Sequence, residues 1–122
     1  MKALNLINSA ENKLKCKNIM SYKLDCEILL SKVLEKKREE ILINLDQNID
    51  IKNIKKFNEL VKRRLKKEPV AYIINEKEFW SKVFEVNRDT LIPRPETELM
   101  IEQLVKIYKK KKILVLDIGT GS

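Results

Sequence analysis

The period of the hydrophobic pattern changes near residue 75, and this change limits the folds that the chain can adopt. Up to that point, apolar residues recur every three or four positions, which is the spacing of one face of an α-helix. Beyond it, they gather in short aromatic and β-branched runs, which are typical of strands. The sequence therefore predicts a small all-helical domain over residues 1–75, followed by a region that contains strands.

The helical region is expected to contain four helices. Their predicted ranges are 2–15, 22–36, 38–44 and 51–68. Ser21 and Asp50 are the expected N-caps, because their side-chain oxygens can accept hydrogen bonds from free N–H groups at a helix start. Pro69 disfavours the helical conformation at Glu68 and so marks the end of the fourth helix.

A β-hairpin is expected after the helical domain. Residues 78–80 and 83–86 are rich in aromatic and β-branched side chains and predict its two strands. Ser81 and Lys82 lie between the two runs and are the expected turn residues. Phe79 and Trp80 are interpreted as core residues of the hairpin.

A proline-led helix is expected next. Pro93 and Pro95 hold the chain extended, and Pro95 suits the first turn of a helix, where its missing N–H costs nothing. Glu96 and Glu98 favour the positive N-terminal end of this helix, and the lysines at 109–112 favour its negative C-terminal end. The lysine run is therefore interpreted as a helix C-terminus rather than a nucleic-acid patch.

The last predicted element is a strand followed by a glycine turn. The continuous apolar run from Ile113 to Leu116 predicts a strand buried on both faces of a parallel sheet. Asp117, Gly119 and Gly121 follow it, as in the first βα unit of a nucleotide-binding α/β domain. Such a turn holds the methionine end of S-adenosylmethionine (SAM) in methyltransferases or a pyrophosphate in dehydrogenases. It also occurs as an ordinary tight turn.

The composition excludes several chemistries. The chain has no histidine, so it cannot run Ser-His or Cys-His nucleophilic catalysis. Its two cysteines, Cys16 and Cys26, form no CxxC pair, and we expect no metal site and two reduced thiols. No apolar run is long enough for a transmembrane helix or a secretory signal, so we expect a cytoplasmic protein without membrane contact.

The formal net charge of the 122 residues is +8, with 26 basic and 18 acidic side chains. An excess of this kind indicates either an acidic partner such as RNA or a solvated lysine-rich surface. The second reading is favoured, because only seven aromatic side chains are present to stack on bases.

Several segments closely resemble the release-factor glutamine methyltransferase family. They are Asp25-Cys26-Glu27-Ile28-Leu29-Leu30, Arg63-Arg64, Glu68-Pro69-Val70-Ala71-Tyr72-Ile73-Ile74, Glu78-Phe79-Trp80, Phe84-Glu85-Val86, Leu91-Ile92-Pro93-Arg94-Pro95-Glu96-Thr97-Glu98 and Leu116-Asp117-Ile118-Gly119-Thr120-Gly121-Ser122. The resemblance covers most of the chain from about Asp25 onward, and the Leu-Ile-Pro-Arg-Pro-Glu-Thr-Glu segment is its most specific part.

The resemblance implies a fold and an activity. The fold is an α-helical N-terminal domain over residues 1–75, a β-hairpin and Pro-rich linker over 76–94, and the truncated start of a Rossmann-like α/β domain over 95–122. The activity is SAM-dependent methylation of the glutamine side-chain amide in the Gly-Gly-Gln loop of peptide chain release factors, during translation termination. The helical domain would help to hold the release factor. We expect a monomer.

The resemblance also assigns site residues. It implies SAM contacts for the loop residues, which are Asp117, Gly119, Thr120, Gly121 and Ser122. Arg94, Thr97 and Glu98 either line the cofactor or glutamine pocket, or cap a helix and form a surface ion pair. The two readings stay open for Arg94, and the structural one is favoured for Thr97 and Glu98. No catalytic residue is expected within these 122 residues.

The chain departs from the family pattern at several positions. The family usually has glycine where this chain has Lys67, Asn75 and Ser81, and alanine where it has Cys26. Because a lone parallel strand lacks its sheet, we expect the chain to be a fragment that is inactive alone. Two alternatives stay open: a helical protein- or RNA-binding module without catalysis, and a methyltransferase of the same class with another protein or a nucleobase as acceptor.

Overall fold

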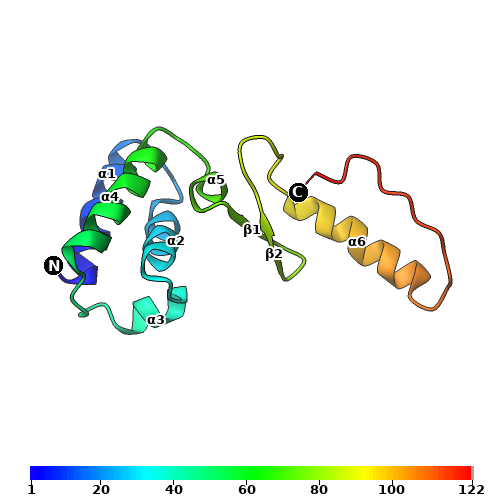
Figure 1. Cartoon of the computed structure of the whole chain (residues 1–122), viewed down its shortest axis with the longest axis horizontal. Coiled ribbons are helices and arrows are strands. Elements are labelled where there is room, and N and C mark those ends of the chain that lie inside the picture. Colours follow the sequence, from blue (N-terminus) through cyan, green and yellow to red (C-terminus); the bar gives the residue numbers. More distant parts are fainter. Residues whose placement is uncertain (122) are drawn as a thin grey trace. The chain divides into compact units, whose positions relative to one another are not determined.

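The computed structural model describes residues 1–121 and divides the chain into two compact units. The first unit is Met1–Ile74, here called the helical unit. The second begins at Asn75 and is here called the hairpin unit. Each is described by itself (Figure 1).

The helical unit contains five helices (Figure 1). They are α1 (Ala3–Cys16), α2 (Tyr22–Leu34), α3 (Arg38–Ile43), α4 (Ile51–Leu65) and α5 (Val70–Ile74). The first four confirm the predicted helices, although α4 ends four residues before Pro69. The sequence did not predict α5, because five residues are too few to show a helical period.

Helices α1, α2 and α4 surround one apolar core. Leu14, Leu29 and Phe57, one from each helix, are completely buried. Ile41 of α3 and Ile73 of α5 complete the same cluster. The three-and-four spacing that predicted each helix thus also selects its buried face.

The start of α1 is held by the segment that joins α3 to α4. The backbone N–H groups of Ala3 and Leu4 donate to the carbonyls of Gln47 and Leu45, both at 3.0 Å. No side chain caps α1, so these carbonyls satisfy N–H groups that have no partner within the helix. Residues 45–49 therefore act as the N-terminal cap.

The hairpin unit begins with strands β1 (Glu76–Phe79) and β2 (Lys82–Glu85), which pair antiparallel. The turn residues are Trp80 and Ser81, both at positive φ as a type I′ turn requires. The prediction of a Ser81-Lys82 turn was wrong by one residue. With this register Phe79 and Phe84 share a face and pack edge to face, 6.0 Å between ring centroids. Trp80, expected in the hairpin core, lies in the turn instead and is 41% exposed.

Helix α6 (Pro95–Tyr108) follows, with Pro95 in its first turn as predicted. None of its residues is buried. The side chains of Leu99, Met100, Leu104 and Ile107 form an exposed apolar stripe.

Residues 113–116 form no strand and are exposed, so the predicted buried strand is absent from this structure. A strand requires a neighbour with which to share hydrogen bonds. Within residues 1–121 the only strands are β1 and β2, which pair with each other. The structure therefore does not confirm the predicted start of a Rossmann-like domain.

Three positions at which the resemblance predicts glycine lie in the left-handed region. The φ angles are +64° at Lys67, +58° at Asn75 and +55° at Ser81. Glycine adopts these angles without steric cost, and asparagine tolerates them better than other residues with a side chain. The turns keep their left-handed geometry, so Lys67 and Ser81 carry backbone strain.

Candidate functional site

The glycine loop has the backbone that a ligand-holding turn needs. Gly119 and Gly121 both have a φ of +75°, and apart from the adjoining residues no heavy atom lies within 4 Å of the point that a Cβ would occupy at either position. Asp117 and Thr120 are exposed beside them. Ser122 lies outside the described residues. The loop therefore gathers exposed backbone groups and one carboxylate.

Glu98 links the hairpin turn to the first turn of α6. Its Oε1 accepts a hydrogen bond of 2.8 Å from the backbone N–H of Trp80. The bond gives the turn N–H a charged partner and anchors the start of α6 to the hairpin. The sequence favoured helix capping and a surface ion pair over a pocket role for Glu98, and a partner 18 residues away in a turn left no signal in the local pattern.

Arg94 and Thr97 lie at the same helix start but bond only through the backbone. Arg94 is the N-cap residue, and its carbonyl accepts a 3.1 Å hydrogen bond from the N–H of Thr97. Both residues lie at the surface. Neither makes a side-chain hydrogen bond or an ion pair within residues 1–121. Their side chains are therefore available to a ligand.

Arg63 holds the chain at its exit from the helical unit. Its Nε and Nη2 donate to both carboxylate oxygens of Glu68 at 2.9 and 2.7 Å. Its Nη1 and Nη2 also reach the carbonyls of Ile73 and Tyr72, both at 3.3 Å. The bond to Glu68 raises the pKa of the Arg63 guanidinium above its usual value. Arg63 thus satisfies carbonyls at the end of α5, which has too few residues to bond them internally.

Arg64 joins α4 to α2 through a largely buried ion pair. Its Nε donates to Asp25 Oδ2 at 2.6 Å, and Ser21 Oγ donates to the same oxygen at 2.9 Å. Asp25 is the one buried charged residue of the described chain. The Ser21 hydroxyl therefore donates to the Asp25 carboxylate and does not cap α2 as predicted. The motif residues Arg63 and Arg64 are structural ties, although the sequence suggested a partner contact or a solvated face.

The two cysteines differ in reactivity. Cys26 is completely buried, and burial raises the pKa of its thiol to about 12, with smaller contributions from Glu11, Asp25 and Glu27. The thiol therefore stays neutral and unreactive, because the thiolate is the nucleophile. Cys16 is exposed at the end of α1. Among the described residues, no cluster of side chains could hold a metal ion.

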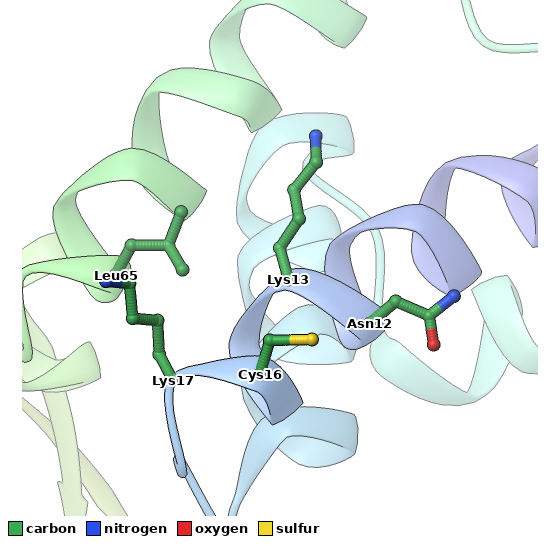
Figure 2. A pocket seen from close by; sticks show the side chains of 5 residues that line it. All are labelled: Asn12, Lys13, Cys16, Lys17 and Leu65. Carbon is green, nitrogen blue, oxygen red and sulfur yellow. The ribbon is translucent and has the colours of Figure 1, made fainter.

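An open hollow of about 410 Å³ lies where α1 and α4 end together. Asn12, Lys13 and Cys16 of α1 and its C-cap residue Lys17 line it on one side, and Leu65 lines it from α4 (Figure 2). Its wall is apolar, because Leu65, the Cys16 thiol and the methylene stems of the lysines form the surface. No sequence motif marks this hollow, since it depends on how two distant helices pack.

Comparison with known proteins identifies related chains. The PrmC N-terminal domain family matches residues 5–74. The release factor glutamine methyltransferase of Coxiella burnetii is 45% identical over 101 residues, which are 82% of this chain and 36% of the relative. That of Buchnera aphidicola subsp. Baizongia pistaciae is 44% identical over 122 residues, 99% of this chain and 44% of the relative. A protein of Rickettsia felis named bifunctional methyltransferase is 44% identical over 100 residues, 82% of this chain and 19% of the relative.

These relatives share one class of activity, since all three are named as methyltransferases. Within that class, the chain belongs to the release factor glutamine methyltransferase family, and its helical unit is a PrmC N-terminal domain. The chain spans less than half the length of each of these relatives. In the described residues, no helix has the length and apolar character needed to cross a membrane.

Proposed function

We propose that this chain is the N-terminal part of an enzyme that methylates a glutamine side-chain amide in peptide chain release factors. The observation that carries the proposal is the family membership. Relatives named for this activity match between four fifths and nearly all of the chain at 41–45% identity. The helical unit would contact the release factor, and the segment after α6 would contribute to the cofactor site.

The glycine loop suits SAM in chemistry and backbone geometry. Asp117, Gly119, Thr120 and Gly121 would hold its methionine end, the carboxylate pairing with the ammonium group. The left-handed φ angles at both glycines support this role, because other residues adopt them only at a cost. Bound SAM supplies an electrophilic methyl group on a sulfonium. An amide nitrogen is a weak nucleophile, so the protein must act mainly by alignment.

The start of α6 would position the substrate side of the same site. Glu98 holds the helix start against the hairpin turn through the Trp80 N–H. Arg94 and Thr97 would then present free side chains from a fixed backbone toward the cofactor or the glutamine. In this proposal Glu98 is a positioning residue, and Arg94 is the residue that contacts the ligand directly.

The charge distribution supports a partner-binding role for the helical unit. Residues 1–74 carry 17 basic and 10 acidic side chains, whereas the remainder of the chain carries 9 and 8. Almost the whole net charge therefore lies in the PrmC N-terminal domain. Such an excess speeds encounter with an acidic partner.

The test uses the protein purified from its own cells, SAM with an isotopically labelled methyl group, and a purified release factor. The expected result is label on the glutamine of the Gly-Gly-Gln loop, located by peptide mass spectrometry. A release factor with that glutamine changed to alanine should take up no label. Label on any other residue, or none with the native protein, would overturn the proposed substrate.

The 122 residues alone are proposed to lack this activity. The loop at 117–121 is exposed, and within the described residues no strand precedes it. The isolated chain in the same assay should therefore give no label. Methyl transfer by the isolated chain would contradict this part of the proposal.

A second candidate is a methyltransferase with a different acceptor. The Rickettsia felis relative, named bifunctional methyltransferase, carries a matching segment over 19% of its length. The same labelling assay separates the candidates when a nucleic acid fraction is offered in competition with the release factor. Label in the nucleic acid would favour the second acceptor class.

A further inference from the structure

The hollow between α1 and α4 combines an apolar wall with free positive charge. Leu65 lines it from α4, and Lys13, Cys16 and Lys17 line it from the C-terminal end of α1 (Figure 2). Lys13 and Lys17 make no ion pair within residues 1–121. An apolar surface rimmed by unpaired lysines is complementary to a segment with the opposite arrangement, an apolar side chain flanked by carboxylates.

Both helices that form the hollow end on a lysine. Lys17 is the C-cap residue of α1, and Lys66 is the C-cap residue of α4. A positive side chain within the last turn of a helix offsets the negative end of the helix dipole. Lys13 and Lys15 lie in the last turn of α1, and Lys62, Arg63 and Arg64 lie in that of α4. Positive charge is therefore concentrated where these two helices end.

The wall of the hollow favours a protein segment over a nucleic acid. Single-stranded nucleic acids are held by aromatic side chains on which bases stack. None of the five lining residues is aromatic. Arginine forks, which match phosphate geometry, are also absent from the lining, because Arg63 and Arg64 are engaged with Glu68 and Asp25.

We propose that this hollow is a docking site for an acidic segment of the partner protein. One apolar side chain of that segment would lie between Cys16 and Leu65, and neighbouring carboxylates would pair with Lys13 and Lys17. The docking site rests on the proposed function in one respect, since the partner is taken to be the release factor. It adds the place on the helical unit where that partner docks and the chemistry that it presents.

The experiment measures the affinity of the purified 122-residue chain for a purified release factor by isothermal titration calorimetry. The test variant is K13E/K17E, and the matched control is K52E/K55E, which makes the same charge change at the opposite end of α4. All four lysines are exposed, so neither variant disturbs the core. We expect K13E/K17E to weaken binding about tenfold or more, and the control to change it less than about twofold.

Two further measurements keep the test decisive. The neutral variant K13Q/K17Q should show an intermediate loss, which separates lost attraction from new repulsion. A synthetic acidic peptide with one central leucine should compete with the release factor, and the same peptide with serine in place of leucine should compete less. Equal competition by both peptides would contradict the apolar part of the site.

The outcomes distinguish the two proposals. If the unchanged chain does not bind the release factor, partner recognition by the helical unit fails. If it binds, and K13E/K17E binds as tightly as K52E/K55E, the docking site fails while partner recognition stands. Binding of a single-stranded RNA at this site, lost in K13E/K17E, would replace the acidic segment with a nucleic acid and overturn the inference.

Discussion

Helices α1 and α6 have the same length, 14 residues, but differ in how many side chains they bury. Helix α1 buries five side chains, and α6 buries none. Both carry an apolar stripe at helical spacing, so the local pattern does not explain the difference. The difference lies in what surrounds them: α1 packs on α2 and α4, whereas α6 is the one helix among the described residues of its unit. An amphipathic pattern thus specifies a helix, and burial requires a partner in addition.

The same contrast holds for the whole units. Of the fifteen buried apolar side chains within residues 1–121, fourteen lie in the core of the helical unit, and Val86 is the remaining one. Burial of apolar surface is the main favourable contribution to folding. We therefore infer that the helical unit carries nearly all of the chain's cooperative stability.

The largest difference in the free energy of unfolding should come from a leucine-to-alanine substitution made in one unit or the other. Leu29→Ala in α2 removes a completely buried side chain, and should lower the free energy of unfolding by about 2–5 kcal/mol because a cavity remains. Leu99→Ala in α6 removes a side chain that is 62% exposed, and should change it by less than about 0.5 kcal/mol. Urea unfolding followed by circular dichroism at the helix signal measures both. Equal losses would show that α6 is packed in solution and that the two helices do not differ in burial.

A smaller effect is expected from the ion pairs. Asp25→Asn leaves the Arg64 guanidinium without its carboxylate, and should cost about 2–3 kcal/mol because both side chains are largely buried. The matched change in the hairpin unit is Glu102→Gln, which breaks the exposed i,i+4 pair with Lys106. That change should cost at most about 0.5 kcal/mol. A low cost for Asp25→Asn, measured in the same urea titration, would mean that Arg64 is hydrated and that the tie between α2 and α4 is weak.

The helices of the first unit were predictable because their signals are local. Apolar spacing gave the ranges of α1 to α4, and Asp50 caps α4 as predicted, accepting from the Asn53 N–H at 2.7 Å. The hairpin was predictable as an element, but its turn was misplaced. The register of the two strands places Phe79 and Phe84 on one face. This contact is made across strands, so the local sequence of either strand does not reveal it.

The site residues were less predictable, for a physical reason. The roles of Arg63, Arg64 and Glu98 depend on partners that folding brings close. These partners are separated from them in the sequence, so the local pattern does not show the contacts. The hollow at Lys13 and Leu65 is likewise a product of packing. The prediction of a strand at residues 113–116 was wrong for the converse reason. Its local apolar signal was clear, but within the described residues it has no neighbouring strand with which to pair.

The smallest effect concerns the left-handed residues, which occur in both units. Lys67 follows the C-cap of α4 at a φ of +64°, and Ser81 lies in the hairpin turn at +55°. Lys67→Gly should stabilise the helical unit by about 0.5–1 kcal/mol, because the relief of left-handed strain exceeds the added freedom of the unfolded chain. The adjacent Lys66→Gly is the matched control: its φ is −82°, so glycine there relieves nothing and should be neutral or destabilising.

Ser81→Gly should relieve a similar strain, yet leave the urea midpoint of the helix signal unchanged, because the hairpin does not share the core of the helical unit. Its gain should appear instead as slower hydrogen exchange at amides of β1 and β2, measured by nuclear magnetic resonance. A shift of the helix midpoint in Ser81→Gly would show that the two units unfold together. Stability would then be a property of the whole chain, and the contrast between α1 and α6 would have to be explained by coupling rather than by the lack of a partner.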